Sequence, residues 1–63
     1  MTPVYLKISD GYLSRYSADR ELLEEGFWRW VHADGREEIV QESALPIGTL
    51  ERVEKAKDLG ERL

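Results

Sequence analysis

The chain contains no cysteine, so neither a disulfide nor a thiolate zinc site can stabilise it. With 63 residues it is also near the lower limit for a domain that folds by itself. So small a body buries only about 60% of the surface that its unfolded chain exposes. Each large apolar side chain is therefore needed for packing, and we expect a single domain over residues 1–63 whose stability rests on its core.

Long apolar runs and basic patches are absent as well. No segment approaches the roughly 20 apolar residues of a membrane span, and residues 1–11 lack the basic and then apolar stretches of a secretory signal. Nine Lys and Arg face thirteen Asp and Glu, which gives a net charge of −4. Binding to a phosphate backbone relies on clustered Lys and Arg. We therefore expect a cytoplasmic protein without membrane contact, for which nucleic acid is an unfavoured partner.

Two Asp-Gly pairs, Asp10-Gly11 and Asp34-Gly35, are each flanked by β-branched and aromatic residues, which is the pattern of a β-hairpin. In the first hairpin, a two-residue turn at Asp10-Gly11 pairs Ile8 with Leu13. Side chains alternate along a strand, so aliphatic residues gather on one face and tyrosines on the other. The aliphatic face, which we expect to be core, consists of Val4, Leu6, Ile8 and Leu13; the other consists of Tyr5, Lys7, Tyr12, Ser14 and Tyr16.

The second hairpin lies within WRWVHADGREEIVQ and is expected to have the same turn. A two-residue turn places Trp30 opposite Ile39, and this pair is the expected core contribution of the hairpin. Trp28, nearer the start of its strand, is the tryptophan that we expect to be partly exposed. Arg29, on the opposite face, is expected to meet Glu38 or Glu42. A turn one residue longer exchanges all of these partners.

Two helices complete the expected fold. In SADRELLEEG, Ser17 is a suitable N-cap and Gly26 a suitable stop, which predicts a helix of about two turns between the hairpins. In TLERVEKAKDLG, Thr49 is the expected N-cap and Gly60 follows the last turn. The sequence thus predicts an α+β fold: a small antiparallel sheet of three to four strands, made from two Asp-Gly hairpins and packed by a C-terminal helix, with a short helix between the hairpins.

No arrangement of residues indicates catalysis or a bound cofactor. His32 is the only imidazole, and the sequence places no nucleophile and orienting group around it as a triad requires. The one cluster that resembles a metal site is His32 with Asp34, Glu37 and Glu38; a surface histidine paired across the strands with Glu37 is the simpler interpretation. The glycines stand singly, so no phosphate loop is present. We expect no enzyme, no metal and no cofactor.

Aromatic and acidic side chains are the remaining candidates for function. Exposed tyrosines and tryptophans are typical anchors of protein interfaces, and acidic groups around them fit a basic partner. Each has a structural alternative, namely a ring in the core or a charge in water. The residues that we expect to contact a partner protein are Tyr5, Tyr12, Tyr16, Trp28, Arg29, Glu37, Glu38 and Glu42.

The last helix is a candidate seam for a homodimer. Its apolar residues are spaced by three, so the arc that they form drifts around the helix and leaves part of itself for a partner. These residues are Leu50, Val53, Ala56 and Leu59.

The function expected from these features is that of a non-enzymatic protein-interaction module that covers a basic, nucleic-acid-binding surface of its partner. Inhibitors carried by phages and mobile elements, such as anti-CRISPR proteins, offer an analogy of size and charge. The alternative is a module that binds nucleic acid or chromatin. The segment FWRWVHADGREEIVQESALPI resembles in outline the wing of small winged-helix excisionases, although no helix-turn-helix precedes it and its glutamates repel phosphate. A chromo-like or SH3-like barrel also fits the expected order of elements.

Overall fold

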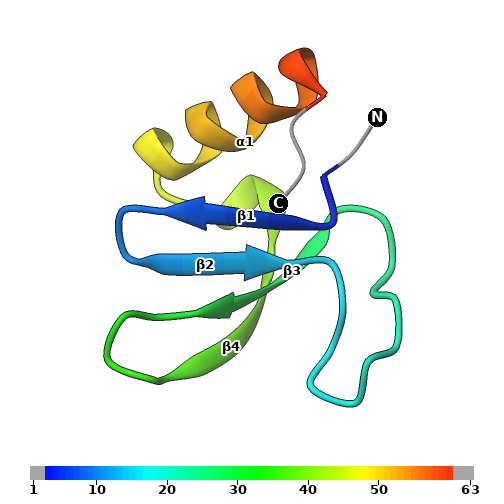
Figure 1. The fold of residues 1–63 in the computed structure, drawn as a ribbon. Coiled ribbons are helices and arrows are strands. Elements are labelled where there is room, and N and C mark those ends of the chain that lie inside the picture. Colours follow the sequence, from blue (N-terminus) through cyan, green and yellow to red (C-terminus); the bar gives the residue numbers. More distant parts are fainter. Residues whose placement is uncertain (1–2, 61–63) are drawn as a thin grey trace.

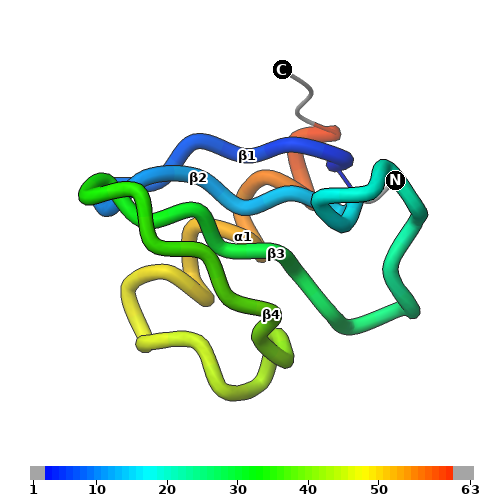
Figure 2. The backbone as a smooth tube through the Cα atoms, turned by 90° about the horizontal axis from the view of Figure 1, so that it is seen from below, coloured from blue at the N-terminus to red at the C-terminus, as the bar shows by residue number. Residues whose placement is uncertain are grey.

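The computed structural model of the protein describes residues 3–60. The strands β1 (Tyr5–Ile8), β2 (Gly11–Ser14), β3 (Phe27–Val31) and β4 (Glu37–Gln41) are followed by a 3₁₀ turn, η1 (Glu42–Ala44), and a helix, α1 (Ile47–Leu59). The strands form one antiparallel sheet in the order β1-β2-β3-β4. Figures 1 and 2 show α1 lying across one face of this sheet, on the side of β1. The predicted α+β fold, with a C-terminal helix on a small antiparallel sheet, is confirmed.

The core lies between the sheet and α1. Three residues of the predicted aliphatic face of the first hairpin, Leu6, Ile8 and Leu13, are buried, whereas Val4 lies before β1 and is half-buried. Val53 and Ala56 of α1 are fully buried in the same cluster. Trp30, Val40 and Leu50 pack around the margin. The buried residues of this cluster are Leu6, Ile8, Leu13, Trp28, Leu45, Val53 and Ala56.

The helix α1 ends as predicted but begins earlier. Gly60 takes a φ of 64° and donates its N–H to carbonyls of the last turn, which is the expected left-handed stop. The helix begins directly after Pro46, whose carbonyl accepts the N–H of Leu50 at 2.8 Å. Thr49 therefore lies inside the first turn, and its predicted role as N-cap is wrong.

The turn of the first hairpin is displaced by one residue from its predicted position. Ile8 pairs with Gly11 instead of Leu13, so Ser9 and Asp10 are the turn residues. Both have negative φ, and Gly11 follows with a φ of 93°, as in turns that end on a left-handed residue. Because the partner of Ile8 changes by two positions, every side chain stays on its predicted face.

The loop of the second hairpin is one residue longer than predicted. Trp30 pairs with Glu38, so the predicted pair of Trp30 with Ile39 is wrong. Residues 33–35 form the loop, and Gly35 takes a φ of 96°. A shift by one residue reverses the two faces of β4. Ile39 consequently lies away from the helix with 53% of its surface exposed, while Val40 packs against the core.

The segment between the hairpins is an ordered loop, and the short helix predicted there is wrong. Ser17 Oγ does accept main-chain N–H groups, those of Asp19 and Glu21, as an N-cap would. However, the main-chain N–H of Ser17 donates to the carbonyl of Glu21, and Arg20 has a φ of 67°, which is incompatible with an α-helix.

The Arg15 side chain explains the shape of this loop. Its guanidinium donates to the carbonyl oxygens of Leu23, Glu24 and Phe27, and the residue is only 5% exposed. The main-chain N–H of Leu23, which a helix would pair with the carbonyl of Asp19, donates instead to the carbonyl of Arg15 at 2.8 Å. A tertiary contact therefore outweighs the local helix signal.

Gly11 provides a test of how closely β2 approaches β3. A Cβ built on Gly11 would overlap the carbonyl oxygen of Val31, whereas the same position on Gly35 is open although its φ is similar. We expect Gly35→Ala to lower the free energy of unfolding by about 1 to 2 kcal/mol, the strain of a left-handed alanine. Gly11→Ala should lower it clearly more, because the strands must separate. Urea denaturation followed by tryptophan fluorescence measures both losses, and equal losses would contradict the close approach.

Candidate protein-binding surface

The face of the sheet opposite α1 carries no helix within residues 3–60 (Figure 2). Its side chains come from two cross-strand rows, one through Lys7, Tyr12, Val31 and Glu37 and one through Tyr5, Ser14, Arg29 and Ile39. We call this surface the outer face. Four of the residues predicted to contact a partner, Tyr5, Tyr12, Arg29 and Glu37, lie together on it.

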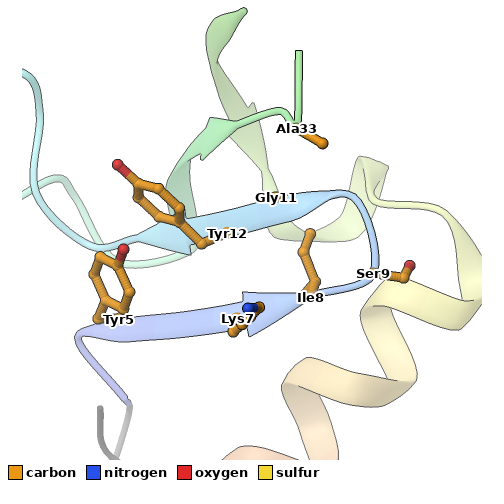
Figure 3. Close-up of a pocket in the computed structure, with 7 residues that line it drawn as sticks. All are labelled: Tyr5, Lys7, Ile8, Ser9, Gly11, Tyr12 and Ala33. Atoms are coloured by element: carbon orange, nitrogen blue, oxygen red, sulfur yellow. The ribbon is translucent and has the colours of Figure 1, made fainter. Parts of the chain in front are cut away.

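Tyr5 and Tyr12 form the aromatic part of the outer face. Their rings stack with centroids 4.6 Å apart and planes at 24°, and Figure 3 shows both hydroxyls on the same side of the hairpin. Burial raises the pKa of Tyr5, and the neighbouring Tyr12 adds to the rise. Tyr5 is thus a neutral hydrogen-bonding group near pH 7. Together with Lys7, Ser9 and Ala33, among others, the rings line an open hollow of about 470 Å³ (Figure 3).

Tyr16 lies beyond the end of β2, where it forms an isolated bridge with Leu22 and is 40% exposed. Its carbonyl oxygen accepts a hydrogen bond of 2.8 Å from Arg29 Nε. The guanidinium of Arg29 also donates to Glu37 Oε1 at 2.7 Å. The partners predicted for Arg29, Glu38 or Glu42, are wrong because the longer loop moves Glu37 onto its face.

Trp28 and Glu42 stabilise the fold on the helix side. Trp28 is fully buried, so its predicted partial exposure is wrong, and the half-buried tryptophan is Trp30. Trp28 Nε1 donates to Glu42 Oε1 at 2.9 Å, and Lys57 Nζ lies 2.8 Å from Glu42 Oε2. Burial alone raises the pKa of Glu42, but the hydrogen bonds from Lys57 and Trp28 outweigh it and hold the pKa below its ordinary value. This carboxylate is consequently ionised and engaged inside the protein.

His32 joins the first turn to the second hairpin. It is only 8% exposed and stacks on Trp30 with ring centroids 4.3 Å apart. Nδ1 lies 3.1 Å from Asp10 Oδ2 and Nε2 lies 2.9 Å from Glu38 Oε2. Ionised carboxylates only accept hydrogen bonds, so both contacts are satisfied by the doubly protonated imidazolium. The predicted surface pairing of His32 with Glu37 is wrong, again because the loop is longer.

A second hollowed region lies between the ordered loop and β4. One hollow of about 310 Å³ is lined by Ser17, Ala18, Asp19, Arg29, Glu37, Glu38 and Ile39. The next, of about 240 Å³, is lined by Leu23, Glu24, Phe27 and Ile39. The two meet at Ile39, and we call them together the Ile39 groove. The sequence did not predict this groove because the two-residue turn places Ile39 in the core and the predicted helix removes its wall.

Comparison of the chain with family models, curated proteins and solved structures gives no match. Across residues 3–60 there is no cluster of three or more His, Cys, Asp or Glu side chains suited to a metal ion. The same residues include no helix whose length and apolar character would allow it to cross a bilayer. We therefore infer the function from the outer face, the Ile39 groove and the distribution of charge.

The bridge made by His32 predicts a dependence of stability on pH. The hydrogen bond that His32 donates to Asp10 raises the pKa of His32, and the same bond lowers the pKa of Asp10. The stability that the raised pKa of His32 contributes is fully present at a pH below about 6.5, the pKa of histidine in the unfolded chain. This stability is lost as the pH rises through the pKa of His32 in the folded protein. Stability from the lowered pKa of Asp10 is lost only on acidification below about pH 4.

We expect His32→Gln to destabilise the protein relative to the wild type at pH 5.5 and to do so less at pH 8.5. Urea denaturation of both proteins at the two pH values measures this difference. Lys55→Gln, on the exposed side of α1, serves as the control that changes one charge elsewhere. A difference between wild type and His32→Gln that is the same at both pH values would show that the bridge is not charged.

Proposed function

We propose that the protein is a non-enzymatic module that applies its outer face to a basic surface of a partner protein. The observation that carries this proposal is the stacked pair of Tyr5 and Tyr12 on a sheet face that no helix of residues 3–60 covers. Tyrosines offer a large contact area, lose little side-chain entropy on binding and keep a hydroxyl for hydrogen bonds. Ile39, which is 53% exposed, extends the same face with an apolar side chain.

The exposed charge supports a basic partner. Arg15 is buried on main-chain carbonyls, and three further basic side chains are paired within the chain. These pairs are Arg29–Glu37, Arg36–Asp34 and Lys57–Glu42. Asp19, Glu21 and Glu24 are exposed, and within residues 3–60 no basic side chain forms an ion pair with them. Complementary potentials speed association and disfavour partners of the same charge.

In its finer form, the proposal is a cytoplasmic inhibitor of the kind carried by phages and mobile elements, comparable in size and charge to anti-CRISPR proteins. It would act by occupying a basic surface that otherwise binds nucleic acid. Covering the partner's surface in this way requires no catalytic group. Use of the second hairpin as a nucleic-acid wing has less support, since Arg29 and Arg36 are both neutralised by carboxylates at 2.7 and 2.9 Å.

Self-association through α1 is a separate part of the proposal. Val53 and Ala56 face the core and are not available to a second copy. Leu59, at the end of the helix, is 65% exposed and would form the contact. A monomer mass, measured by light scattering, that does not change with protein concentration would exclude self-association.

Capture of partners from a lysate of the source cells tests the main proposal. The tagged wild type is compared with the double variant Tyr5→Ser/Tyr12→Ser, with and without nuclease, and the captured protein is then titrated with each variant. We expect one protein to remain bound after nuclease treatment and the double variant to bind it at least about tenfold more weakly.

The matched control is Ile47→Ser, which removes an exposed apolar side chain from α1 and should leave this affinity unchanged. Circular dichroism establishes that each variant is folded. Loss of the partner on nuclease treatment would identify nucleic acid as the ligand, and equal binding by both variants would exclude the outer face.

A further inference from the structure

We infer that the Ile39 groove binds an extended basic segment of the partner, with one aliphatic side chain of that segment seated on Ile39. This inference rests on the proposed function and deepens it by naming where the partner binds and what chemistry it presents. Three features of the groove support it: its apolar floor, its carboxylates and the rigidity of its wall.

The floor of the groove is apolar and open. Ile39 is 53% exposed, and Leu23 and Phe27 are half-buried beside it around a hollow of about 240 Å³. Isolated exposed apolar residues are ordinary on protein surfaces. The three apolar residues around this hollow form a seat for a single aliphatic side chain, whose burial there would remove apolar surface from water.

Carboxylates surround this floor. Four acidic residues line the two hollows, but one of them, Glu38, turns its carboxylate to His32 on the other face of the sheet. Arg29 is the one basic side chain among the lining residues. Arg29 is paired with Glu37, and Glu38 contacts His32. The carboxylates of the groove are therefore those of Asp19, Glu24 and Glu37. The groove is thus negative, which selects lysine or arginine on either side of the apolar anchor. A second copy of this acidic chain would bring the same sign of charge, so it is a poor occupant.

The wall of the groove is held in place before any partner arrives. Leu23, Glu24 and Phe27 line the groove, and the carbonyl oxygen of each accepts a hydrogen bond from the buried guanidinium of Arg15. A wall that is already ordered lowers the entropy that binding would otherwise cost. β4, the last strand in the order of the sheet, contributes Glu37, Glu38 and Ile39 to the lining of the groove, so an extended segment would lie along this strand.

The test is a nuclear magnetic resonance titration of the ¹⁵N-labelled full chain with short synthetic peptides. The probe has the sequence Lys-Arg-Leu-Lys-Arg, and its two controls replace the leucine with serine or the four basic residues with glutamate. We expect the first peptide to shift amides of Asp19, Leu23, Glu24 and Ile39. The serine peptide should bind at least about fivefold more weakly, and the glutamate peptide should not bind.

Two variants test whether the peptide binds in the groove. Ile39→Ser should weaken binding of the leucine peptide at least about fivefold, whereas Ile47→Ser, which removes an equally exposed isoleucine from α1, should not change it. Shifts spread evenly over the acidic residues of α1, or equal binding of the leucine and serine peptides, would overturn the inference. Concentration-dependent shifts at the groove without peptide would identify a second copy as the occupant and overturn it too.

The captured partner separates this inference from the function on which it rests. If Tyr5→Ser/Tyr12→Ser loses the partner and Ile39→Ser keeps it, the outer face stands and the groove does not. If both variants lose the partner while Ile47→Ser keeps it, both are supported. If none of the variants loses it, both fail.

Discussion

The buried guanidinium of Arg15 is the interaction on which the rest of the structure depends. A charge withdrawn from water is strongly unfavourable unless every donor is satisfied. Here three carbonyls of the loop accept its hydrogen bonds, and the guanidinium lies 5.5 Å from the centre of the Trp28 ring. The main chain of Arg15 is fixed as well, through the carbonyl of Val4 and the N–H of Leu23. One side chain therefore orders the loop, covers the central tryptophan and shapes the surface offered to a partner.

The sequence was sufficient to predict features that depend on neighbouring residues. Alternation placed Leu6 and Leu13 in the core and Tyr5 and Tyr12 outside it, and Gly60 marked the end of α1. Loop length was not predictable, because an Asp-Gly pair fits both two-residue and three-residue connections. In the first hairpin the error changed partners by two positions and kept the faces. In the second hairpin the error changed partners by one position, so Val40 packs against the core and Ile39 is exposed.

The candidate site was predictable only in part, for a related reason. The tyrosines needed no knowledge of tertiary structure, whereas the burial of Trp28 depends on where η1 brings Glu42 and where α1 brings Lys57. The groove could not be predicted from the sequence, because Ser17 and Gly26 are strong local signals for a helix in the segment that forms its wall. Those signals are overridden by contacts from Arg15, a residue outside the segment. A long-range hydrogen bond of this kind leaves no periodic pattern in the sequence.

The order of the strands has a consequence for how the chain folds. Each strand pairs with the strand next to it in the sequence, so the longest loop that the sheet must close is the one over residues 15–26. The helix is different, because α1 rests on β1 and joins nearly opposite ends of the chain. Closing that long span is the entropically costly step, and it also excludes water from Leu6 and Trp28. The sheet is therefore expected to form early in folding without tight packing. Docking of α1 on the sheet is then expected to limit the folding rate.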